Sequence, residues 1–470
     1  MHKKRLSVSV LLLLLVEIVN KVFPLYIIHF VQKKLGVEGF GYAQFGISII
    51  EMAVPFIVFG YHNFGSIELG RSNEDAEKTR KLISSIFILK LFHAALVFAF
   101  LSAVFTAIPA YHPYRSLVLI LSFMLFFSSI DSLWVQVGVQ KVAIFSFFNG
   151  ASKLISFLLI IFTISTPDDA ILYAAFTLMA NVLICIFTGI YSFRKFPFLK
   201  PSRQDMWEVF KASRVYAAVV ILTVVLERID LVIVEKLFGV KGVGLYSGPL
   251  RLVHSVNQLI GVVILPFFSE MVSVQDSRSL ANHTRASIVV LMAILAPSVA
   301  GIWFVDQQIL ELIFSPEYSS VNRVLSLLLL GITCSAMSLV FGFNILMLRD
   351  AQWKVIGSLI VGGSLSIVLA FVLGNIWGYE GVATAVVIGK ATTAILTAIF
   401  ALKFISYFPW QDFVKTIFAA SLMAAGLHFI PSDNMLITIL SGAVIYFFAI
   451  VIVYFKDLGH VAKYIKGRFF

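Results

Sequence analysis

The chain has 470 residues, of which 60% are hydrophobic and only 13% are charged, and its formal net charge is +11. Soluble globular chains are about 45–50% apolar and about 25% charged, so this composition excludes a soluble enzyme, a disordered chain and a secreted disulfide scaffold. The sequence predicts an all-α polytopic membrane protein.

Apolar stretches follow one another along the whole chain. A membrane-spanning helix requires about 20 mainly apolar residues, and this criterion gives about fourteen candidates. The predicted spans are 6–31, 41–64, 82–108, 114–138, 142–164, 169–193, 212–238, 243–270, 285–305, 323–347, 354–377, 380–404, 412–430 and 434–455. The start, MHKKRL, imitates a signal peptide, but the first stretch continues to Val31 without a small-residue cleavage site. We therefore expect it to be retained as the first helix.

Basic residues predict the orientation of these helices, because cytoplasmic loops collect Lys and Arg. With the N-terminus inside, the inner loops and tails hold twenty-four basic residues and the outer loops hold six. Both termini are therefore expected in the cytoplasm. The same distribution explains the positive net charge without a nucleic-acid partner, since the excess lies on inner loops and tails.

A glycine pattern indicates an internal repeat. LGVEGFGYAQF follows the first predicted helix and FGVKGVGLYSG follows the seventh, so Gly36 and Gly41 recur as Gly239 and Gly244. Both copies lie on the outer side by the charge distribution, which predicts two parallel six-helix lobes around a central cavity, a plan known from transporters. The expected lobes are residues 1–200 and 201–408, and residues 409–470 form an appended pair, helices 13 and 14, with a cytoplasmic tail.

Six basic residues fall inside the predicted spans, where each costs about 2.5–3.5 kcal/mol unless it pairs or faces water. They come from both lobes and predict a cationic cavity for an anionic ligand, because Lys and Arg bind phosphate oxygens. The candidate substrate-binding residues are Lys21, Lys90, Lys153, Arg228, Arg251 and Lys390. The alternative is structural ion pairing between helices.

Acidic residues also lie within the spans. Glu17 is four residues before Lys21, and Glu227 and Asp230 bracket Arg228, so local pairing is expected at both places. Asp230, with Glu17 or Asp131, is the candidate for coupling to an H⁺ or Na⁺ gradient.

Other chemistry has little support in the sequence. Cys185 and Cys334 lie in apolar stretches without CxxC spacing, and the His residues show no HExxH pattern, so no metal site is predicted. The chain also lacks a GxxxxGK[ST] loop, which argues against an ATP-driven pump. No catalytic residue and no cofactor is expected.

Several segments in order resemble bacterial polysaccharide repeat-unit flippases, the O-antigen (Wzx-type) branch of the multidrug, oligosaccharidyl-lipid and polysaccharide exporter superfamily. The resemblance covers most of residues 17–400 and rests on LGVEGFGYAQF, FGYHNFGSIELGR, Lys90, DSLWVQVGVQK, DLVIVEKLFGVKGVGLYSGPLRL and Pro266. Family members commonly have twelve helices, so the fourteen predicted here either include a span that is divided in error or resemble the fourteen-helix relatives.

The resemblance implies a transporter in the bacterial cytoplasmic (inner) membrane. It would carry undecaprenyl-pyrophosphate-linked oligosaccharide, such as an O-antigen unit for lipopolysaccharide, to the outer leaflet by alternating access. Membrane lipids, a polysaccharide polymerase and chain-length machinery are the partners that it implies.

Three alternatives remain. A lipid II flippase has a similar substrate. A cation-coupled drug exporter of the same superfamily would favour an acidic cavity, whereas the buried bases here match or exceed the acids. A membrane glycosyltransferase or polymerase would need a sizeable outer loop, and the predicted outer loops are no longer than about 20 residues.

Overall fold

The computed structural model describes residues 2–71, 76–138, 142–273, 276–430 and 434–454, and the side chains of 2–25, 71, 137–138, 142–146, 258–259, 261–263, 265–270 and 272–273 lie outside the described part. All regular secondary structure in these ranges is helical. The chain divides into two compact units, residues 1–247 and 248–470.

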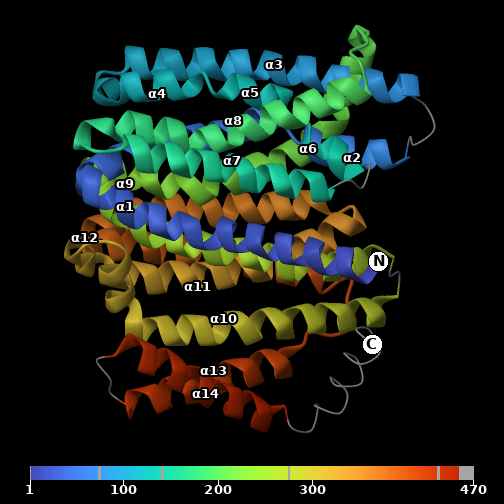
Figure 1. The fold of residues 1–470 in the computed structure, drawn as a ribbon. Coiled ribbons are helices and arrows are strands. Elements are labelled where there is room, and N and C mark those ends of the chain that lie inside the picture. The colour runs from blue at the N-terminus through green and yellow to red at the C-terminus, as the bar shows by residue number, and fades with distance from the viewer. Residues whose placement is uncertain (1, 72–75, 139–141, 274–275, 431–433, 455–470) are drawn as a thin grey trace. The chain divides into compact units, whose positions relative to one another are not determined.

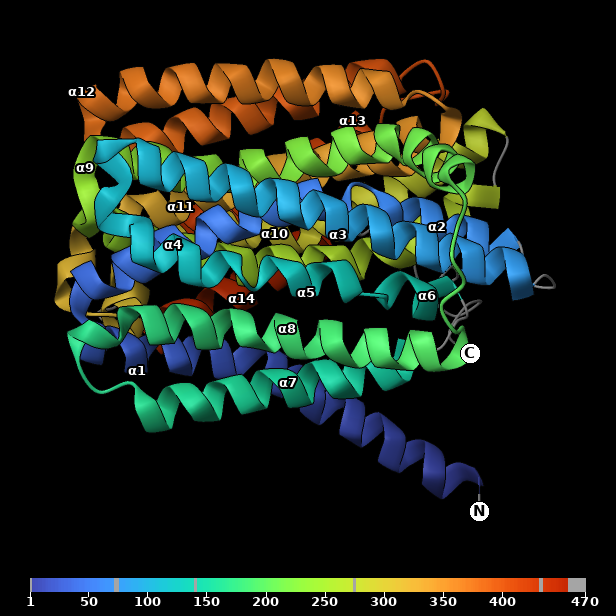
Figure 2. The same cartoon turned by 90° about the horizontal axis from the view of Figure 1, so that it is seen from above.

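The first unit contains the N-terminal helices and the first part of α9. Its elements are α1 (His2–Val58), α2 (Tyr61–Arg71), α3 (Ala76–Ala107), a 3₁₀ turn (Pro109–Tyr114), α4 (Arg115–Ser122), α5 (Leu125–Ile130), α6 (Leu133–Gly138), α7 (Val142–Thr163), a 3₁₀ turn (Pro167–Asp169), α8 (Ala170–Lys195) and α9 (Arg203–Ser273). Within this unit α3 packs along α4 and α5, and α7 packs along α8 (Figures 1 and 2).

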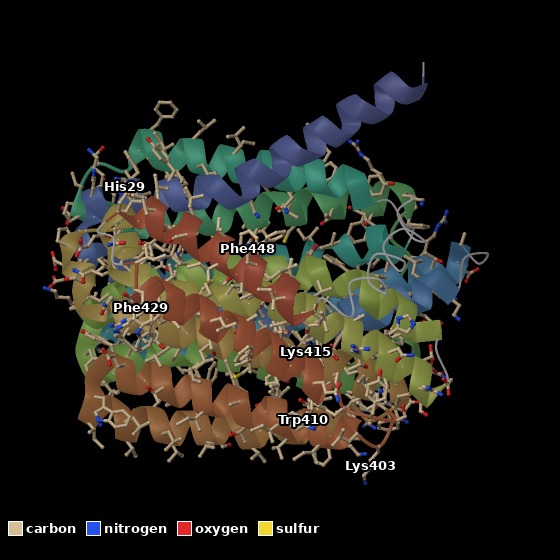
Figure 3. All side chains as sticks on the ribbon, turned by 90° about the horizontal axis from the view of Figure 1, so that it is seen from below. His29, Lys403, Trp410, Lys415, Phe429 and Phe448 are labelled. Carbon is tan, nitrogen blue, oxygen red and sulfur yellow. The ribbon has the colours of Figure 1, made fainter. Side chains whose placement is uncertain are left out.

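The second unit contains the rest of α9 and the C-terminal helices. They are α10 (Ser277–Ile313), a 3₁₀ turn (Pro316–Val321), α11 (Asn322–Ser338), a π-helical segment (Leu339–Leu346), a 3₁₀ turn (Met347–Arg349), α12 (Gln352–Ala401), α13 (Trp410–His428) and α14 (Met435–Val453). Helix α13 packs on both α10 and α14. In Figure 3, Lys403, Trp410 and Lys415 lie toward one end of α13, and Phe429 lies toward the other.

Three helices change direction at a glycine. Gly36 in α1, Gly239 in α9 and Gly378 in α12 have φ values of 66°, 67° and 62°, which side chains with a Cβ rarely adopt. The three helices contain 57, 71 and 50 residues, and each is therefore long enough to cross a bilayer twice, once on either side of its glycine. The first two glycines are the pair that the sequence repeat predicted.

The outer surface of the helices is apolar, as expected for a membrane protein. Phe100 in α3, Ile376 in α12 and Phe447 in α14 are 66%, 64% and 63% exposed. Within the described ranges, eight helical segments are long and apolar enough to cross a membrane. The chain is thus an all-α, multi-pass membrane protein, while the count of about fourteen spans and the division at residues 200 and 408 remain predictions.

Candidate functional site

A break in one helix organises the polar side chains of the first unit. The predicted span 114–138 is divided into α4, α5 and α6, and Asp131 leaves the helical conformation with φ −54° and ψ 122°. The Asp131 carboxylate accepts a hydrogen bond from the Leu133 main-chain N–H at 3.0 Å and so caps α6. The Thr188 hydroxyl of α8 donates to the same oxygen at 3.2 Å. Broken helices inside membranes are typical of ligand and ion sites, where polar groups satisfy the freed backbone.

Lys90, in α3, contacts the main chain at this break. Its side chain is fully buried, and its Nζ donates to the main-chain oxygen of Asp131 at 2.7 Å. The Nε2 of His62, in α2, lies 3.3 Å from the Lys90 Nζ and 3.5 Å from an Asp131 carboxylate oxygen. The three side chains therefore form one network, defined here as the His62–Lys90–Asp131 cluster, in which Lys90 is buried while His62 and Asp131 remain 23% and 18% exposed. This network can hold and transfer protons but does not open Lys90 to a large ligand.

Arg228 pairs across the repeat rather than along its own helix. Its guanidinium lies 2.8 Å from the carboxylate of Glu51 in α1, although Glu227 and Asp230 bracket it in sequence. The side chains of Arg228 and Glu51 remain 23% and 32% exposed. An arginine held in a partly open ion pair can exchange its carboxylate for the oxygens of another anion.

Asp230 is far more enclosed than its neighbour. It is 3% exposed, and its carboxylate accepts a hydrogen bond from the Leu231 main-chain N–H at 2.8 Å. The phenol of the fully buried Tyr246 lies beside it. Any role in coupling would therefore require this part of α9 to open.

The other predicted residues are distributed over several helices. Lys153 lies in α7 and Arg251 in α9, and both are half-buried. Lys390 in α12 packs its aliphatic stem against Gly331 of α11 and forms no hydrogen bond or ion pair with the residues that the structure describes. The side chains of Lys21 and Glu17 lie outside the described residues.

The two predicted repeats meet at their glycine turns. A Cβ at Gly41 would overlap the main-chain oxygen of Val240 and lie 2.6 Å from the nitrogen of Gly244, while a Cβ at Gly244 would overlap the oxygen of Val37. Val37 follows Gly36 and Val240 follows Gly239, so the contact is reciprocal. The turns therefore pack backbone against backbone, which only glycine permits at this separation.

Sequence reasoning identified the residues that carry charge inside predicted spans, and the structure brings Lys90 and Asp131 together. It missed His62 as a site residue, although the glycine-flanked segment FGYHNFG marks the position. It also missed the Glu51–Arg228 pair and two further positive-φ glycines, Gly60 and Gly378. Among the described residues, no group of three or more His, Cys, Asp or Glu side chains converges as a metal site.

Comparison with known proteins gives the same architecture. The chain superposes on "Lipid II flippase MurJ, inward closed conformation" with a TM-score of 0.74 at 17% identity, covering 95% of this chain and 99% of that one. An inward-facing and an outward-facing multidrug resistance MATE family transporter of the MOP superfamily give TM-scores of 0.62 and 0.57 at 14% and 15% identity, covering 82% and 85% of this chain and 94% of each of those.

At the level of sequence, no curated protein matches the chain significantly. Residues 7–272, which are more than half of the chain, match the family described as "Polysaccharide biosynthesis protein". The fold is that of transporters and flippases rather than that of an enzyme. The chain therefore belongs to the polysaccharide biosynthesis protein family and has the fold of the MOP superfamily.

Proposed function

We propose that the protein is a flippase that moves undecaprenyl-pyrophosphate-linked oligosaccharide, an O-antigen or other polysaccharide repeat unit, from the cytoplasmic to the outer leaflet of the bacterial inner membrane. The termini lie in the cytoplasm, and a polymerase or chain-length protein receives the product. Family membership and the likeness to a lipid II flippase support this proposal.

The observation that carries the proposal is the partly open ion pair between Glu51 and Arg228. An arginine inside apolar helices is costly, and one that is held in place yet accessible is suited to a ligand that brings its own negative charge. Pyrophosphate offers oxygens that match the guanidinium fork, so it can displace the Glu51 carboxylate. The sugar needs a polar path, whereas the prenyl chain can remain in an apolar environment.

The other bases have related roles in this proposal. Lys21, Lys153, Arg251 and Lys390 attract the pyrophosphate or acidic sugars as the lobes 1–200 and 201–408 alternate in access. Among the bases whose surroundings are described, Lys390 is the best candidate for binding the anionic headgroup, since it has no anionic partner among the described residues.

Lys90 is too enclosed to bind such a headgroup directly, and we assign it to the coupling machinery with His62 and Asp131. A proton gained or lost in this cluster changes the charge next to the break between α5 and α6, and so links an ion gradient to the position of the helix. Glu17 and Asp230 remain further coupling candidates.

A lipid II-type flippase is the second candidate, because the likeness to a lipid II flippase extends over 95% of this chain. The substrate of such a flippase has the same three parts as a lipid-linked oligosaccharide, namely a prenyl chain, a pyrophosphate and a sugar. A drug exporter is less consistent with the site, since the bases within the membrane would repel cationic drugs.

Complementation tests the proposal. A host that lacks its repeat-unit flippase is supplied with the wild type or with Lys153→Ala, Arg251→Ala, Lys390→Ala or the control Lys403→Ala, which alters an exposed lysine two residues after the end of α12. We expect the wild type and Lys403→Ala to restore surface glycan, and the other variants to accumulate the lipid-linked unit at matched expression. Full activity in all three variants would remove Lys153, Arg251 and Lys390 from the site; full activity of Arg228→Ala as well would remove the cationic site from the proposal. Rescue only of cells depleted of their lipid II flippase would select the second candidate.

A further inference from the structure

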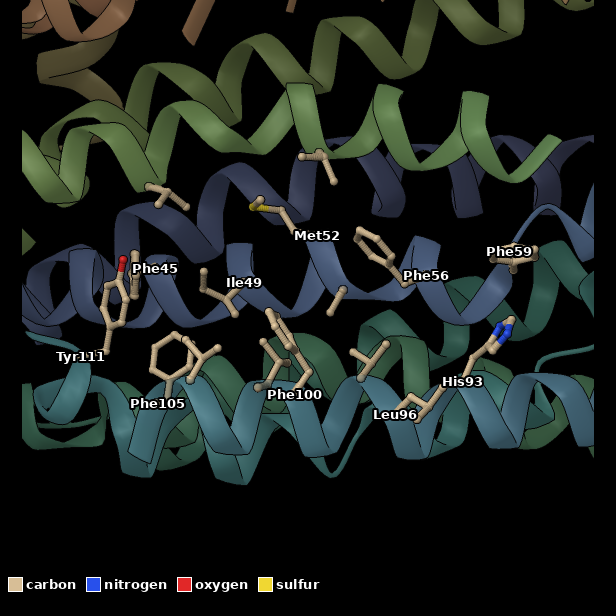
Figure 4. Close-up of a pocket in the computed structure, with 16 residues that line it drawn as sticks. Phe45, Ile49, Met52, Phe56, Phe59, His93, Leu96, Phe100, Phe105 and Tyr111 are labelled. Carbon is tan, nitrogen blue, oxygen red and sulfur yellow. The ribbon is translucent and has the colours of Figure 1, made fainter. Parts of the chain in front are cut away.

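A long apolar groove lies between helices of the first unit. It has a volume of about 680 Å³ and is lined by α3, the part of α1 after Gly36, and the part of α9 before Gly239 (Figure 4). Along α1 it extends from Phe45 to Phe59, which corresponds to about 21 Å of helix. Along α3 the lining residues recur at three- and four-residue spacing, so they form one continuous stripe.

The walls of this groove offer almost no polar group. Figure 4 shows Phe45, Phe56, Phe100 and Phe105 around the space bounded by α1, α3 and α9, with His93 at one end and Tyr111 at the other. Ordered water needs two to four polar partners, and these walls do not provide them along their length. A volume of this size is in the range of ligand pockets, so its occupant is an apolar molecule or part of one.

One side of the groove is open. Phe56, Leu96 and Phe100 line it and are nevertheless 44%, 53% and 66% exposed. In a multi-pass membrane protein, such exposed apolar side chains on spanning helices face lipid. The occupant can therefore enter sideways from the bilayer without crossing water.

The groove is adjacent to a charged group. Val225 and Val232 of α9 contribute to its wall, and Arg228 lies between them, three and four residues away, on the same face of the helix. Its partner Glu51 belongs to the stretch of α1 that lines the groove, between Ile49 and Met52, although it lies on another face of that helix. An apolar groove next to a partly exposed arginine side chain suits a molecule with an anionic head and a long hydrocarbon chain.

We propose that this groove binds the first isoprene units of the polyprenyl chain of the lipid-linked substrate while Arg228 engages the pyrophosphate. The inference rests on the proposed function and adds a second contact, for the chain instead of the headgroup. Methyl-branched isoprene units carry more bulk per unit of chain length than a straight acyl chain, and therefore make more contacts with the phenylalanine-lined walls of a groove of this volume. Ordinary phospholipid is therefore the competing occupant to be tested.

Photolabelling of the full chain tests the proposal. The purified protein is placed in phosphatidylcholine nanodiscs with undecaprenyl pyrophosphate that carries a diazirine on its isoprene units nearest the pyrophosphate, and labelled peptides are identified by mass spectrometry. We expect labels within 45–59 and 93–105. Val97→Trp should reduce them at least about tenfold, because the indole fills the groove and removes the contacts of two or more methylene groups. The matched control Ala95→Trp, exposed on another face of α3, should retain them.

Competition identifies the occupant. Unlabelled undecaprenyl phosphate should displace the label, and an equal mole fraction of phosphatidylglycerol should not. Labelling that Val97→Trp does not reduce, or that phosphatidylglycerol displaces equally well, would overturn the assignment. If the wild type complements a flippase-deficient host but the groove is not labelled, only the chain site fails. If the groove is labelled and complementation is absent, the proposed function fails and the polyprenyl site stands.

Discussion

Removing the buried cation of the His62–Lys90–Asp131 cluster should destabilise the first unit strongly. Lys90→Met keeps an unbranched side chain that is one atom shorter, but removes the hydrogen bond to the Asp131 main-chain oxygen and the charge beside the carboxylate. Hydrogen bonds between membrane helices contribute only about 0.6–1.7 kcal/mol. Leaving one member of a buried ionic group without its partner costs about 3–5 kcal/mol, and the 18% exposure of Asp131 places this case at the lower end of that range. The charge is therefore the larger part of the effect. We expect Lys90→Met to lower the free energy of unfolding by about 3 kcal/mol.

A double-mutant cycle separates this electrostatic effect from lost packing. Asp131→Asn removes the negative charge but retains an oxygen that can cap α6, so Lys90→Met combined with Asp131→Asn leaves no uncompensated carboxylate. The double variant should be more stable than the sum of the single effects predicts, by at least about 1 kcal/mol. The assay is unfolding in mixed micelles titrated with sodium dodecyl sulfate, with Lys403→Met as the control for loss of an exposed lysine. Single effects that add to within about 0.5 kcal/mol would refute the ionic interpretation of the cluster.

Three further variants test other parts of the structure. Gly41→Leu should abolish complementation, because the side chain would enter the backbone of the second repeat, whereas Gly357→Leu, which has no close neighbour, should retain it; equal activity would contradict the turn-on-turn contact. Glu51→Gln frees Arg228 and should tighten binding of undecaprenyl pyrophosphate, measured by equilibrium binding in nanodiscs, and unchanged or weaker binding would argue against exchange of partners. Asp412→Asn breaks the bidentate ion pair between Asp412 of α13 and Arg285 of α10, whose two N···O distances are 2.6 and 3.0 Å. We expect the free energy of unfolding of the second unit to fall by about 1.5–3 kcal/mol. A loss below about 0.5 kcal/mol would show that apolar packing alone holds α13 in place.

The apolar helices and the repeat could be predicted because both depend on local sequence. A run of about 20 apolar residues is required wherever a helix crosses lipid, and glycine is the residue that most readily takes a positive φ, although Phe59 and Asp350 also have one. Gly36 and Gly239 were found because their flanking sequences are alike. Gly378 has a similar backbone conformation in GYEG, which differs from the GVEG at Gly36 by one residue, but the similarity stops there and comparison of the two longer segments did not reveal it.

The polar contacts could not be predicted because they join residues far apart in the chain. Hydropathy gives one continuous span over 114–138, and the break at Asp131 depends on Lys90 and Thr188 from two other helices. Arg228 has acidic neighbours within three residues, yet its ion pair is with Glu51, 177 positions earlier. Sequence identifies which side chains need a partner inside the membrane, and tertiary packing decides which partner each receives.

The reciprocal packing of Gly41 and Gly244 also has a consequence for how the two halves of the gene can diverge. Each glycine faces the main chain of the other copy, so a bulkier residue in one copy is opposed by backbone that no substitution in the second copy can shorten. Compensating changes are therefore unavailable at these two positions, although they remain open to the side chains around them. Duplicated halves that have lost most of their similarity should thus retain this pair of glycines for as long as their turns stay in contact.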